Sequence, residues 1–411
     1  MSTTLSKWFS ALAIAAALTP ATTLAQSEAG PHALIRCNLF DGVENAIRPS
    51  VTVLIADGKI ERIAPVGARL PEGYEIIDCE GNYLVPGLFD VHTHLDSEEA
   101  ALRALASGVT TVRTASVPAY QDVGLRALVR SGALPGPEVV AAGVYVTPDL
   151  EESILADPRL AVLHEGAETE KQLRLLVRVN ADRGVDVIKT RGTERAGRPD
   201  TDPREQVYSR RQLEIIVDEA AQYGLDVMVH AHGDEGALAA VQAGARSIEH
   251  GTYLSEDSLR LMKEKNVWFV PTLITMLEMN EEQYDHVLRL RGSHMVPRLE
   301  VAIRTAHRLG VKFATGADNY YDNESINRIS LEVMHLVRLG LSPFEALQAA
   351  TVHSAELLRM GDRTGRIAPG YEADLFLVPG NPLEDVLALQ DVLLVMSNGQ
   401  IALKRIPFAK Q

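Results

Sequence analysis

Residues 225–251 read LDVMVHAHGDEGALAAVQAGARSIEHG. This stretch holds two short apolar runs, 225–232 and 246–251, separated by residues that suit a helix. A strand, a helix and a second strand in this order are typical of a βα unit in a parallel sheet. The stretch therefore predicts two neighbouring parallel strands, and each of them ends at a histidine.

The same alternation continues on both sides of this unit. Ser209 and Gln212 form a capping box before the amphipathic stretch 210–224, and Ser342 followed by Pro343 opens another helix. Eight strands with intervening helices over roughly 280 residues match an α/β fold of the (β/α)8, TIM-like barrel type. We therefore predict such a barrel over residues 84–363. The eight runs are GLFDVHTH (87–94), VTTVRTA (109–115), PEVVAAG (137–143), VDVIKT (185–190), LDVMVHAH (225–232), RSIEHG (246–251), VWFVPTL (267–273) and VKFATGAD (311–318).

Both ends of the chain have a different pattern, rich in short β-type runs. Asp57-Gly58 and Asn398-Gly399 are dipeptides typical of tight hairpin turns, and Asp41-Gly42 also indicates a turn. Two β-rich ends around a different middle predict a small β-sandwich domain built from both termini, residues 26–83 and 364–411.

Composition excludes some classes of partner. The 411 residues include 40 Lys and Arg against 55 Asp and Glu, which gives a formal net charge of −15, and 46% of them are hydrophobic. Such a chain can bury a large core. We expect no nucleic-acid partner and no anionic membrane surface as partner, because both need a basic footprint.

Residues 1–25 are typical of a secretory signal peptide. Lys7 precedes an apolar stretch that includes ALAIAAAL, and Thr23-Leu24-Ala25 places small residues at the positions of a cleavage site. The apolar stretch of about 11 residues is shorter than the roughly 20 that a spanning helix needs. We therefore expect export to the periplasm or the medium, a mature chain beginning near Gln26, and no stable membrane insertion.

The two cysteines, Cys37 and Cys79, lie in apolar, strand-like runs. An exported protein permits a disulfide between them. The interpretation that we favour is two buried, unpaired small hydrophobic side chains. Neither cysteine is near the histidines, so we expect no catalytic thiol.

Side chains that bind metals stand at the ends of five predicted strands. The carboxyl ends of barrel strands carry the active site, and alternate residues of a strand share a face, so these side chains should converge. Several neutral imidazoles with a carboxylate are what Zn²⁺-like ions prefer. The set is His92 and His94 on the first strand, Lys189 on the fourth, His230 and His232 on the fifth, His250 on the sixth and Asp318 on the eighth.

These motifs resemble those of the amidohydrolase superfamily. The resemblance rests on PGLFDVHTH, IKT, HAHG, SIEHG and TGAD, with NYLVPG before them and GRIAPGYEADLFLV after them, and it covers nearly the whole chain after the leader. HAHG followed by IEHGT and VPTL is most similar to the branch of prolidase-like dipeptidases and imidazolonepropionase-like proteins. Imidazolonepropionase-type sites resemble mononuclear centres, whereas Lys189 at the fourth strand implies two metals. Many prolidase-like relatives have a Gly-Gly-His segment after the third strand, and this chain lacks it.

The resemblance implies a binuclear centre, most suitably of Zn²⁺, in which Lys189 carries a carbamate derived from CO2. A free ammonium beside two dications would be repelled, whereas a carbamate supplies an anionic oxygen to each ion. The implied ligands are His92, His94 and Asp318 for the more buried metal, His230 and His250 for the second metal, and Lys189 as the bridge.

The implied reaction is attack of a metal-bridging hydroxide on a carbonyl carbon. Two metals lower the pKa of a shared water toward neutrality, and Asp318 can pass its proton to the departing amine. In prolidase-like relatives the second histidine of HAHG helps to bind the substrate carboxylate, which would be His232 here; a hydrogen bond to a ligand is the alternative.

Further candidates for substrate contact lie on the long connection after Lys189. Arg191 and Arg195 are suited to hold a free carboxylate by a two-pronged hydrogen bond, and Tyr208 is a third candidate. Arg113, at the end of the second strand, is expected either to orient groups beside the centre or to form a structural ion pair.

The function that we expect is hydrolysis of the amide bond of a dipeptide or N-acyl amino acid, a small-molecule substrate with a free carboxylate. The alternative is hydrolysis of a lactone, carbamate, cyclic imide or organophosphate ester at the same metals. A silent binding protein is disfavoured because the full ligand set is present, and Lys189 argues against a deaminase. The oligomeric state, including a homo-oligomer, stays open.

Overall fold

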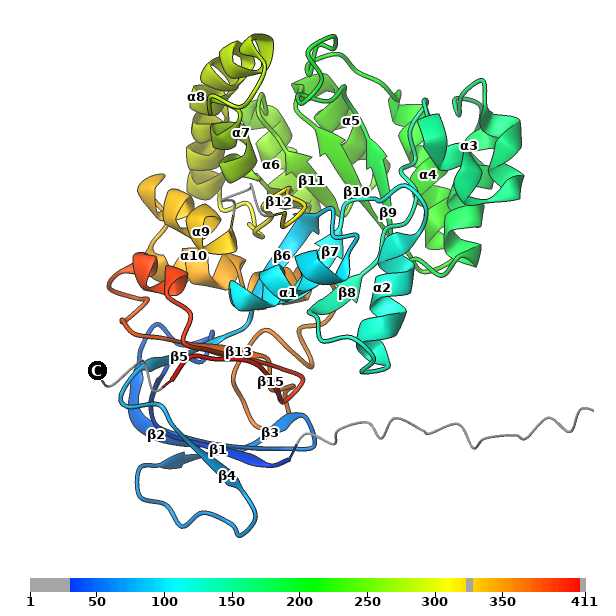
Figure 1. The fold of residues 1–411 in the computed structure, drawn as a ribbon. Helices are drawn as coiled ribbons and strands as arrows, with labels where there is room; N and C mark the ends of the chain where they lie inside the picture. The colour runs from blue at the N-terminus through cyan, green and yellow to red at the C-terminus, as the bar shows by residue number, and fades with distance from the viewer. Residues whose placement is uncertain (1–29, 323–327, 407–411) are drawn as a thin grey trace, which may run out of the picture.

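The computed structural model describes residues 30–322 and 328–406. Figure 1 shows an α/β part above and a smaller, β-rich part below. The predicted signal peptide lies outside the described residues. The mixed α/β fold class is confirmed.

The β-rich part joins strands from both ends of the chain in one eight-stranded sheet. The order is β15-β14-β13-β5-β1-β2-β3, with β4 paired to β1. In Figure 1 this sheet bends so that β5, β13 and β15 lie above β1, β2 and β3, and apolar side chains of these strands form a common core. The strands are β1 (His32–Leu39), β2 (Arg48–Ala56), β3 (Lys59–Pro65), β4 (Glu75–Asp78), β5 (Tyr83–Pro86), β13 (Leu375–Val378), β14 (Leu394–Ser397) and β15 (Gln400–Lys404).

Two of the predicted hairpin turns are confirmed. Asp57-Gly58 joins β2 to β3 and Asn398-Gly399 joins β14 to β15. All four residues have positive φ, which is the backbone of the type I′ turn that Asp-Gly and Asn-Gly favour. Asp41 instead begins a longer loop, where its carboxylate accepts hydrogen bonds from the backbone N–H groups of residues 43 and 44.

Cys37 and Cys79 form a disulfide, so the interpretation that they are unpaired is wrong. Both are fully buried, as expected. The parallel pairing of β1 with β4 aligns Ile35 with Asp78 and brings the two cysteines within 5.2 Å between Cα atoms, a separation typical of disulfides. The sequence carries no direct sign of this parallel pairing.

The α/β part contains two parallel sheets, β6-β7-β8 and β12-β11-β10-β9. Seven of the eight predicted strands are present among the described residues, and helices connect them as expected. The strands are β6 (Leu88–Thr93), β7 (Val109–Thr114), β8 (Glu138–Val140), β9 (Val187–Arg191), β10 (Asp226–Ala231), β11 (Ser247–His250) and β12 (Trp268–Val270). The helices are α1 (Glu98–Ala106), α2 (Gln121–Arg130), α3 (Glu170–Asp182), α4 (Arg210–Ala221), α5 (Asp234–Ala243), α6 (Glu256–Lys265), α7 (Leu273–Glu278), α8 (His286–Leu309), α9 (Ile329–Arg338), α10 (Pro343–Ala349) and α11 (Val352–Leu357), with short 3₁₀ turns η1 (Glu151–Ala156), η2 (Pro158–Leu163) and η3 (Val386–Gln390).

The predicted eighth strand, residues 311–318, is not a regular strand. It makes one parallel bridge, between Phe269 and Phe313, and the backbone N–H of Val91 donates to the carbonyl of Thr315 at 2.9 Å. Asp318, in the left-handed region at φ 49°, ends the extended conformation. This segment thus lies between β12 and β6, while the two sheets remain separate.

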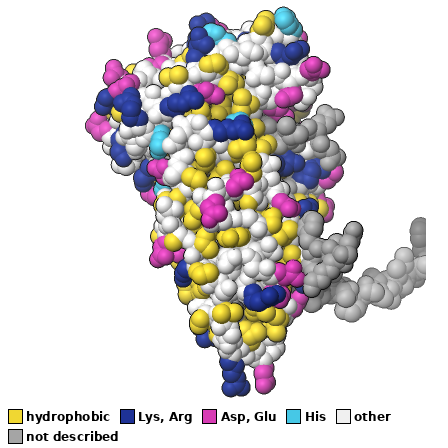
Figure 2. Space-filling view, turned by 90° about the vertical axis from the view of Figure 1, so that its left-hand side faces the viewer, with side chains coloured by type: hydrophobic (Ala, Val, Ile, Leu, Met, Phe, Trp, Pro, Cys, Tyr) yellow, Lys and Arg dark blue, Asp and Glu magenta, His cyan; other side chains and the backbone are white. Residues whose placement is uncertain are grey.

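Two predicted helix starts are confirmed by their caps. Ser209 and Gln212 form a reciprocal capping box at α4, and Ser342 does the same with Glu345 at α10, where Pro343 is the first helical residue. Within the described residues, no helix is both long and apolar enough to cross a membrane. On the face drawn in Figure 2, acidic and basic side chains are interspersed.

Candidate metal centre

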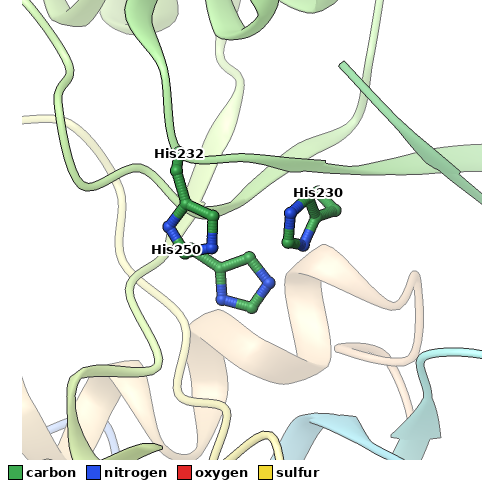
Figure 3. Close-up of side chains that lie close together, drawn as sticks. All are labelled: His230, His232 and His250. Atoms are coloured by element: carbon green, nitrogen blue, oxygen red, sulfur yellow. The ribbon is translucent and has the colours of Figure 1, made fainter. Parts of the chain in front are cut away.

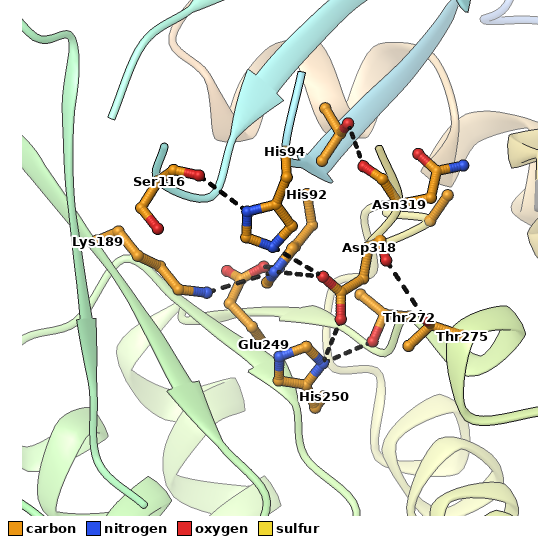
Figure 4. Close-up of polar contacts among 12 residues, drawn as sticks. His92, His94, Ser116, Lys189, Glu249, His250, Thr272, Thr275, Asp318 and Asn319 are labelled. Carbon is orange, nitrogen blue, oxygen red and sulfur yellow. Dashed lines mark hydrogen bonds and ion pairs between the residues drawn. The ribbon is translucent and has the colours of Figure 1, made fainter. Parts of the chain in front are cut away.

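Side chains from several strand ends meet at one place (Figure 4). The Asp318 carboxylate lies 3.4 Å from Nε2 of His92, 3.2 Å from Nε2 of His94 and 3.9 Å from Nδ1 of His250. Lys189 Nζ lies 3.4 Å from Nε2 of His92. Residues that are up to 226 positions apart in the sequence therefore form one cluster, because their strands end at the same edge of the parallel sheets.

Two groups of three side chains that can bind a metal share His250. One group is His92, His250 and Asp318, the other is His230, His232 and His250, and within each group the ligand atoms lie within 4.8 Å of one another. Figure 3 shows the three imidazoles of the second group close together, with the rings of His230 and His232 4.5 and 4.7 Å from that of His250. His232, which we expected to contact substrate, thus lies within a ligand group.

Each of these imidazoles has one ring nitrogen held by a protein group outside the ligand groups, and the second nitrogen of His92 and of His94 faces Lys189 and Asp318 within the cluster. The engaged pairs are His92 Nδ1 with the Glu249 carboxylate (2.6 Å), His94 Nδ1 with the Ser116 carbonyl (2.8 Å), His230 Nε2 with the Glu194 carbonyl (3.0 Å), His232 Nδ1 with the Thr252 hydroxyl (2.8 Å) and His250 Nδ1 with the Thr272 hydroxyl (2.7 Å).

Burial keeps the imidazoles neutral, which is the state that binds metals. It lowers the pKa of His92 to about 4 and that of His232 to about 3, and it holds the pKa values of His230 and His250 well below 6.5. Burial works against ionisation of Asp318 as well, but His92, His94 and Lys189 outweigh it and lower the pKa of this carboxyl. Neutral imidazoles with an ionised carboxylate fit a Zn²⁺-like ion.

Lys189 is the basic group beside these ligands. Its side chain is buried and burial lowers its pKa to about 8. Among the described residues, no carboxylate forms an ion pair with its Nζ. A part of this lysine is therefore uncharged near neutral pH, which makes its nitrogen nucleophilic.

Two of the clustered residues have strained backbones. His250 and Asp318 have φ values of 73° and 49°, which side chains other than glycine rarely adopt. Gly316 lets the neighbouring segment approach β6, because a Cβ there would lie 2.6 Å from Cβ of His92. Strain and close approach at these positions indicate that the fold fixes the side chains of the centre.

Glu249 is a residue of the centre that our sequence analysis missed. It is completely buried, accepts a hydrogen bond from Arg113 at 3.0 Å and lies against His92, and the Ser247 hydroxyl donates to it as well. Arg113 thus forms an ion pair and at the same time orients a group beside the centre, so both interpretations of it hold. The available signal was a glutamate inside an apolar strand, immediately before a histidine.

Arg191 and Arg195 line a cavity of about 370 Å³ next to the centre. Glu194, whose carbonyl accepts from His230, lines the same cavity. Arg191 pairs with the Glu194 carboxylate at 2.8 Å, and Arg195 lies 3.7 Å from Glu151. The Nε atoms of both arginines are buried and without a hydrogen-bond partner, so each retains an unused donor.

Tyr208 is not brought to this cavity's lining. Its side chain is fully buried in the main core and its hydroxyl donates to the carbonyl of Ala167 at 2.7 Å. The hydroxyl is thus used within the fold, and the structure gives no support to the predicted contact with substrate. A tyrosine just before the capping residue of α4 was more simply a packing residue.

Parallel strands whose ends bring together buried, neutral imidazoles, a carboxylate and a buried lysine form a site that could hold a metal ion. The family model "Amidohydrolase family" matches residues 83–402, and the chain belongs to this family. Its homologues hydrolyse carbon–nitrogen bonds, and the resemblance stated from the sequence is confirmed.

Individual proteins show the same relationship. The chain is 28% identical to an ochratoxinase from Aspergillus niger over 358 residues, 75% of this chain and 72% of that protein. It is 26% identical to an imidazolonepropionase from Desulfotalea psychrophila over 382 residues, 81% of this chain and 86% of that one. A solved Xaa-Pro dipeptidase with bound methionine matches with a TM-score of 0.82 and 25% identity, covering 90% of this chain and 99% of the dipeptidase.

Proposed function

We propose that this protein is a binuclear metal-dependent hydrolase that cleaves the amide bond of a dipeptide or N-acyl amino acid. The observation that carries the proposal is the pair of ligand groups that share His250, with Lys189 beside them. His250 can serve only one ion, but the two groups adjoin, and with His94 3.2 Å from Asp318 and Lys189 3.4 Å from His92 they offer enough donors for two neighbouring ions.

We also propose that Lys189, as a carbamate, bridges the two metal ions. A neutral lysine amine adds to CO2 and releases one proton, which gives a carbamate whose single negative charge is shared by two oxygens. The lowered pKa of Lys189, about 8, favours this reaction because it leaves a fraction of the amine uncharged. Glu249 and Asp318 favour the ammonium form, but burial outweighs them, and no carboxylate of the described residues forms a direct ion pair with Nζ.

The chain's own residues would then position and move protons. Two divalent ions, most suitably Zn²⁺, would when bound acidify a water and polarise the scissile carbonyl. Asp318 stays ionised, so it can accept the proton of the attacking water and pass it to the nitrogen of the departing amine. The oxygen of water ends on the acyl carbon, the carbon–nitrogen bond breaks, and the amine leaves neutral.

A carboxylate on the substrate is supported by the cavity beside His230. Arg191 and Arg195 each offer a buried Nε donor with no partner, and donors without acceptors fit an anionic oxygen. A named relative, the Xaa-Pro dipeptidase, acts on dipeptides by its name. We propose the same class of substrate here.

Two further features belong to this proposal. We propose that the two parallel sheets and the 311–318 segment form a (β/α)8 barrel, supported by the backbone hydrogen bonds from Val91 to Thr315 and from Val146 to Lys189. We also propose that the protein is exported to the periplasm or the medium, and the disulfide of Cys37 with Cys79 supports an oxidising compartment.

A substrate panel with a metal count tests the proposal. The purified protein, loaded with Zn²⁺ in bicarbonate buffer, is offered dipeptides and N-acetyl amino acids, each beside its C-terminal amide. We expect hydrolysis of the free acids, at least 10-fold lower kcat/KM for the amides, and about two Zn²⁺ per chain. One tightly held ion per chain would contradict the binuclear centre, and equal rates on acids and amides would contradict the carboxylate subsite.

A further inference from the structure

Tyr145 carries a buried hydroxyl for which the fold provides no partner. This oxygen is shielded from solvent and forms no hydrogen bond. Buried hydroxyls in folded proteins almost always have a partner, because an unpaired one lowers stability. A hydroxyl left unpaired next to a catalytic centre therefore points to a bound ligand as its partner.

The backbone around Tyr145 is held rigidly beside the centre. The N–H of Val146 donates to the carbonyl of Lys189 at 2.9 Å, and the hydroxyl of Thr190 donates to the carbonyl of Val146 at 2.8 Å. On the other side, the Asn180 amide exchanges two hydrogen bonds with the backbone of Val144. The phenol is thus placed by strand β9, the same strand that carries Lys189.

The ring of Tyr145 lies beside Lys189 of the candidate metal centre. Nζ of Lys189 is 5.8 Å from the centre of the Tyr145 ring. Burial is the main cause that raises the pKa of Tyr145; Arg191 and Arg195 lower it in part and Asp318 raises it further, so all three charges act on this hydroxyl. The phenol consequently keeps its proton at neutral pH and can donate it in a hydrogen bond.

We propose that Tyr145 is a catalytic residue whose hydroxyl donates a hydrogen bond to the oxygen of the scissile carbonyl. The inference rests on the proposed amide hydrolysis. With the substrate carboxylate at Arg191 and Arg195 and the acyl carbon near Asp318, a donor beside Lys189 would be within reach of the carbonyl. The carbonyl oxygen gains negative charge when water adds to the acyl carbon, so the hydrogen bond from Tyr145 strengthens in the transition state. The proton stays on Tyr145 throughout.

The variant Tyr145→Phe removes the hydroxyl and keeps the ring. We expect kcat on the best N-acyl amino acid to fall by about 100-fold, with KM changed less than threefold, as for loss of one oxyanion donor. An N-phosphonyl amino acid mimics the tetrahedral intermediate, and we expect its inhibition constant to rise by at least 10-fold, while that of the product amino acid stays unchanged.

Tyr120→Phe is the matched control. Tyr120 also has a buried hydroxyl without a partner, but the charged groups that act on it are Asp157, Arg183, Arg159 and Asp122, which lie outside the centre. We expect wild-type kinetics for this variant. Neither variant should lower the midpoint of urea unfolding, because neither hydroxyl has a partner to lose.

The outcomes separate this inference from the proposed function. Wild-type protein that hydrolyses none of the acids overturns the proposed function, and the inference falls with it. Active wild type with an unchanged kcat for Tyr145→Phe overturns the inference alone. A rise in KM without loss of kcat also overturns it, because Tyr145 would then bind the ground-state substrate, for example its carboxylate.

Discussion

Replacing Glu249 by glutamine tests how the histidines of the centre are held. The carboxylate lies 2.6 Å from Nδ1 of His92 and 3.0 Å from the Arg113 guanidinium, and all three side chains are buried. Glutamine keeps the shape and removes the charge. Arg113 is then buried without a counter-charge, and His92 faces an amide instead of a carboxylate.

The magnitude follows from the acidity of Glu249. Burial by itself would raise the pKa of Glu249, but Arg113 and His92 outweigh it and lower the pKa from 4.5 to about 2. A shift of this size corresponds to roughly 3 kcal/mol of stability. Because the pKa is lowered on folding, this contribution is present above about pH 4.5 and is lost as the pH falls toward 2. Burial lowers the pKa of Arg113 although Glu249 lies beside it. Because removing Arg113 from water costs part of the free energy that the ion pair gains, the roughly 3 kcal/mol is an upper value.

Two measurements check this prediction. Urea unfolding of the metal-free protein at pH 7 should show that Glu249→Gln lowers the apparent free energy of unfolding by up to about 3 kcal/mol. Competition with a chelator should show a 10- to 100-fold loss of Zn²⁺ affinity, as expected when the partner of a ligand imidazole is removed. Glu256→Gln, at an exposed ion pair with Arg260 and Arg308, is the control and should change neither. Wild-type stability and affinity in Glu249→Gln would refute the reasoning.

Three further predictions concern separate parts of the molecule. Lys189→Ala should abolish hydrolysis, and a small carboxylic acid such as formate should restore part of it in steady-state assays; full activity without the acid would exclude the carbamate. Cys37→Ser with Cys79→Ser should lower the apparent free energy of unfolding by roughly 2–4 kcal/mol in urea titrations, and an unchanged midpoint would show that the disulfide does not stabilise the fold. Burial raises the pKa of Asp374 from 3.8 to about 6. The ionised carboxylate therefore destabilises the folded state by up to roughly 3 kcal/mol at pH 7. The folded state gains stability as the pH falls from 6 toward 4, because Asp374 becomes protonated there. Asp374→Asn should therefore be more stable than wild type at pH 7 and less pH-dependent below it, and lower stability at pH 7 would contradict this sign.

The candidate ligands were predictable because they depend on the geometry of single strands. His92 with His94 and His230 with His232 are alternate residues at strand ends, and side chains two apart on a strand share a face. Parallel strands end at one edge, so their last residues meet whatever the loops do. The same rule placed Lys189, His250 and Asp318, although the segment before Asp318 is not a regular strand.

The partners of these ligands could not be predicted in the same way. The Ser116 carbonyl and the Thr272 hydroxyl act from loops, and their contacts with His94 and His250 depend on loop backbones that no periodic pattern specifies. For Tyr208, the sequence predicted a contact with substrate from its place on a long connection, and it gave no sign that the hydroxyl donates to the carbonyl of Ala167 within the buried core. Likewise, the pairing of the cysteines depends on the register of β1 against β4, which is a tertiary property.

This division has a consequence for the specificity of the enzyme. Apart from Asp318, the candidate ligands lie on strands β6, β9, β10 and β11 or one residue beyond them. The cavity with Arg195 is lined mainly by the connection between β9 and α4, together with Arg191 at the end of β9 and residues 148, 149 and 168. Changes in that connection alter the space and the charges that a substrate meets, but they leave the strand ends in place. The residues that would carry out the reaction therefore stand in short strand-end motifs that can be recognised in the sequence. The cavity beside the candidate centre depends instead on how one long connection packs, which is why the sequence left amide, lactone and carbamate substrates open while it predicted the residues of the candidate metal centre.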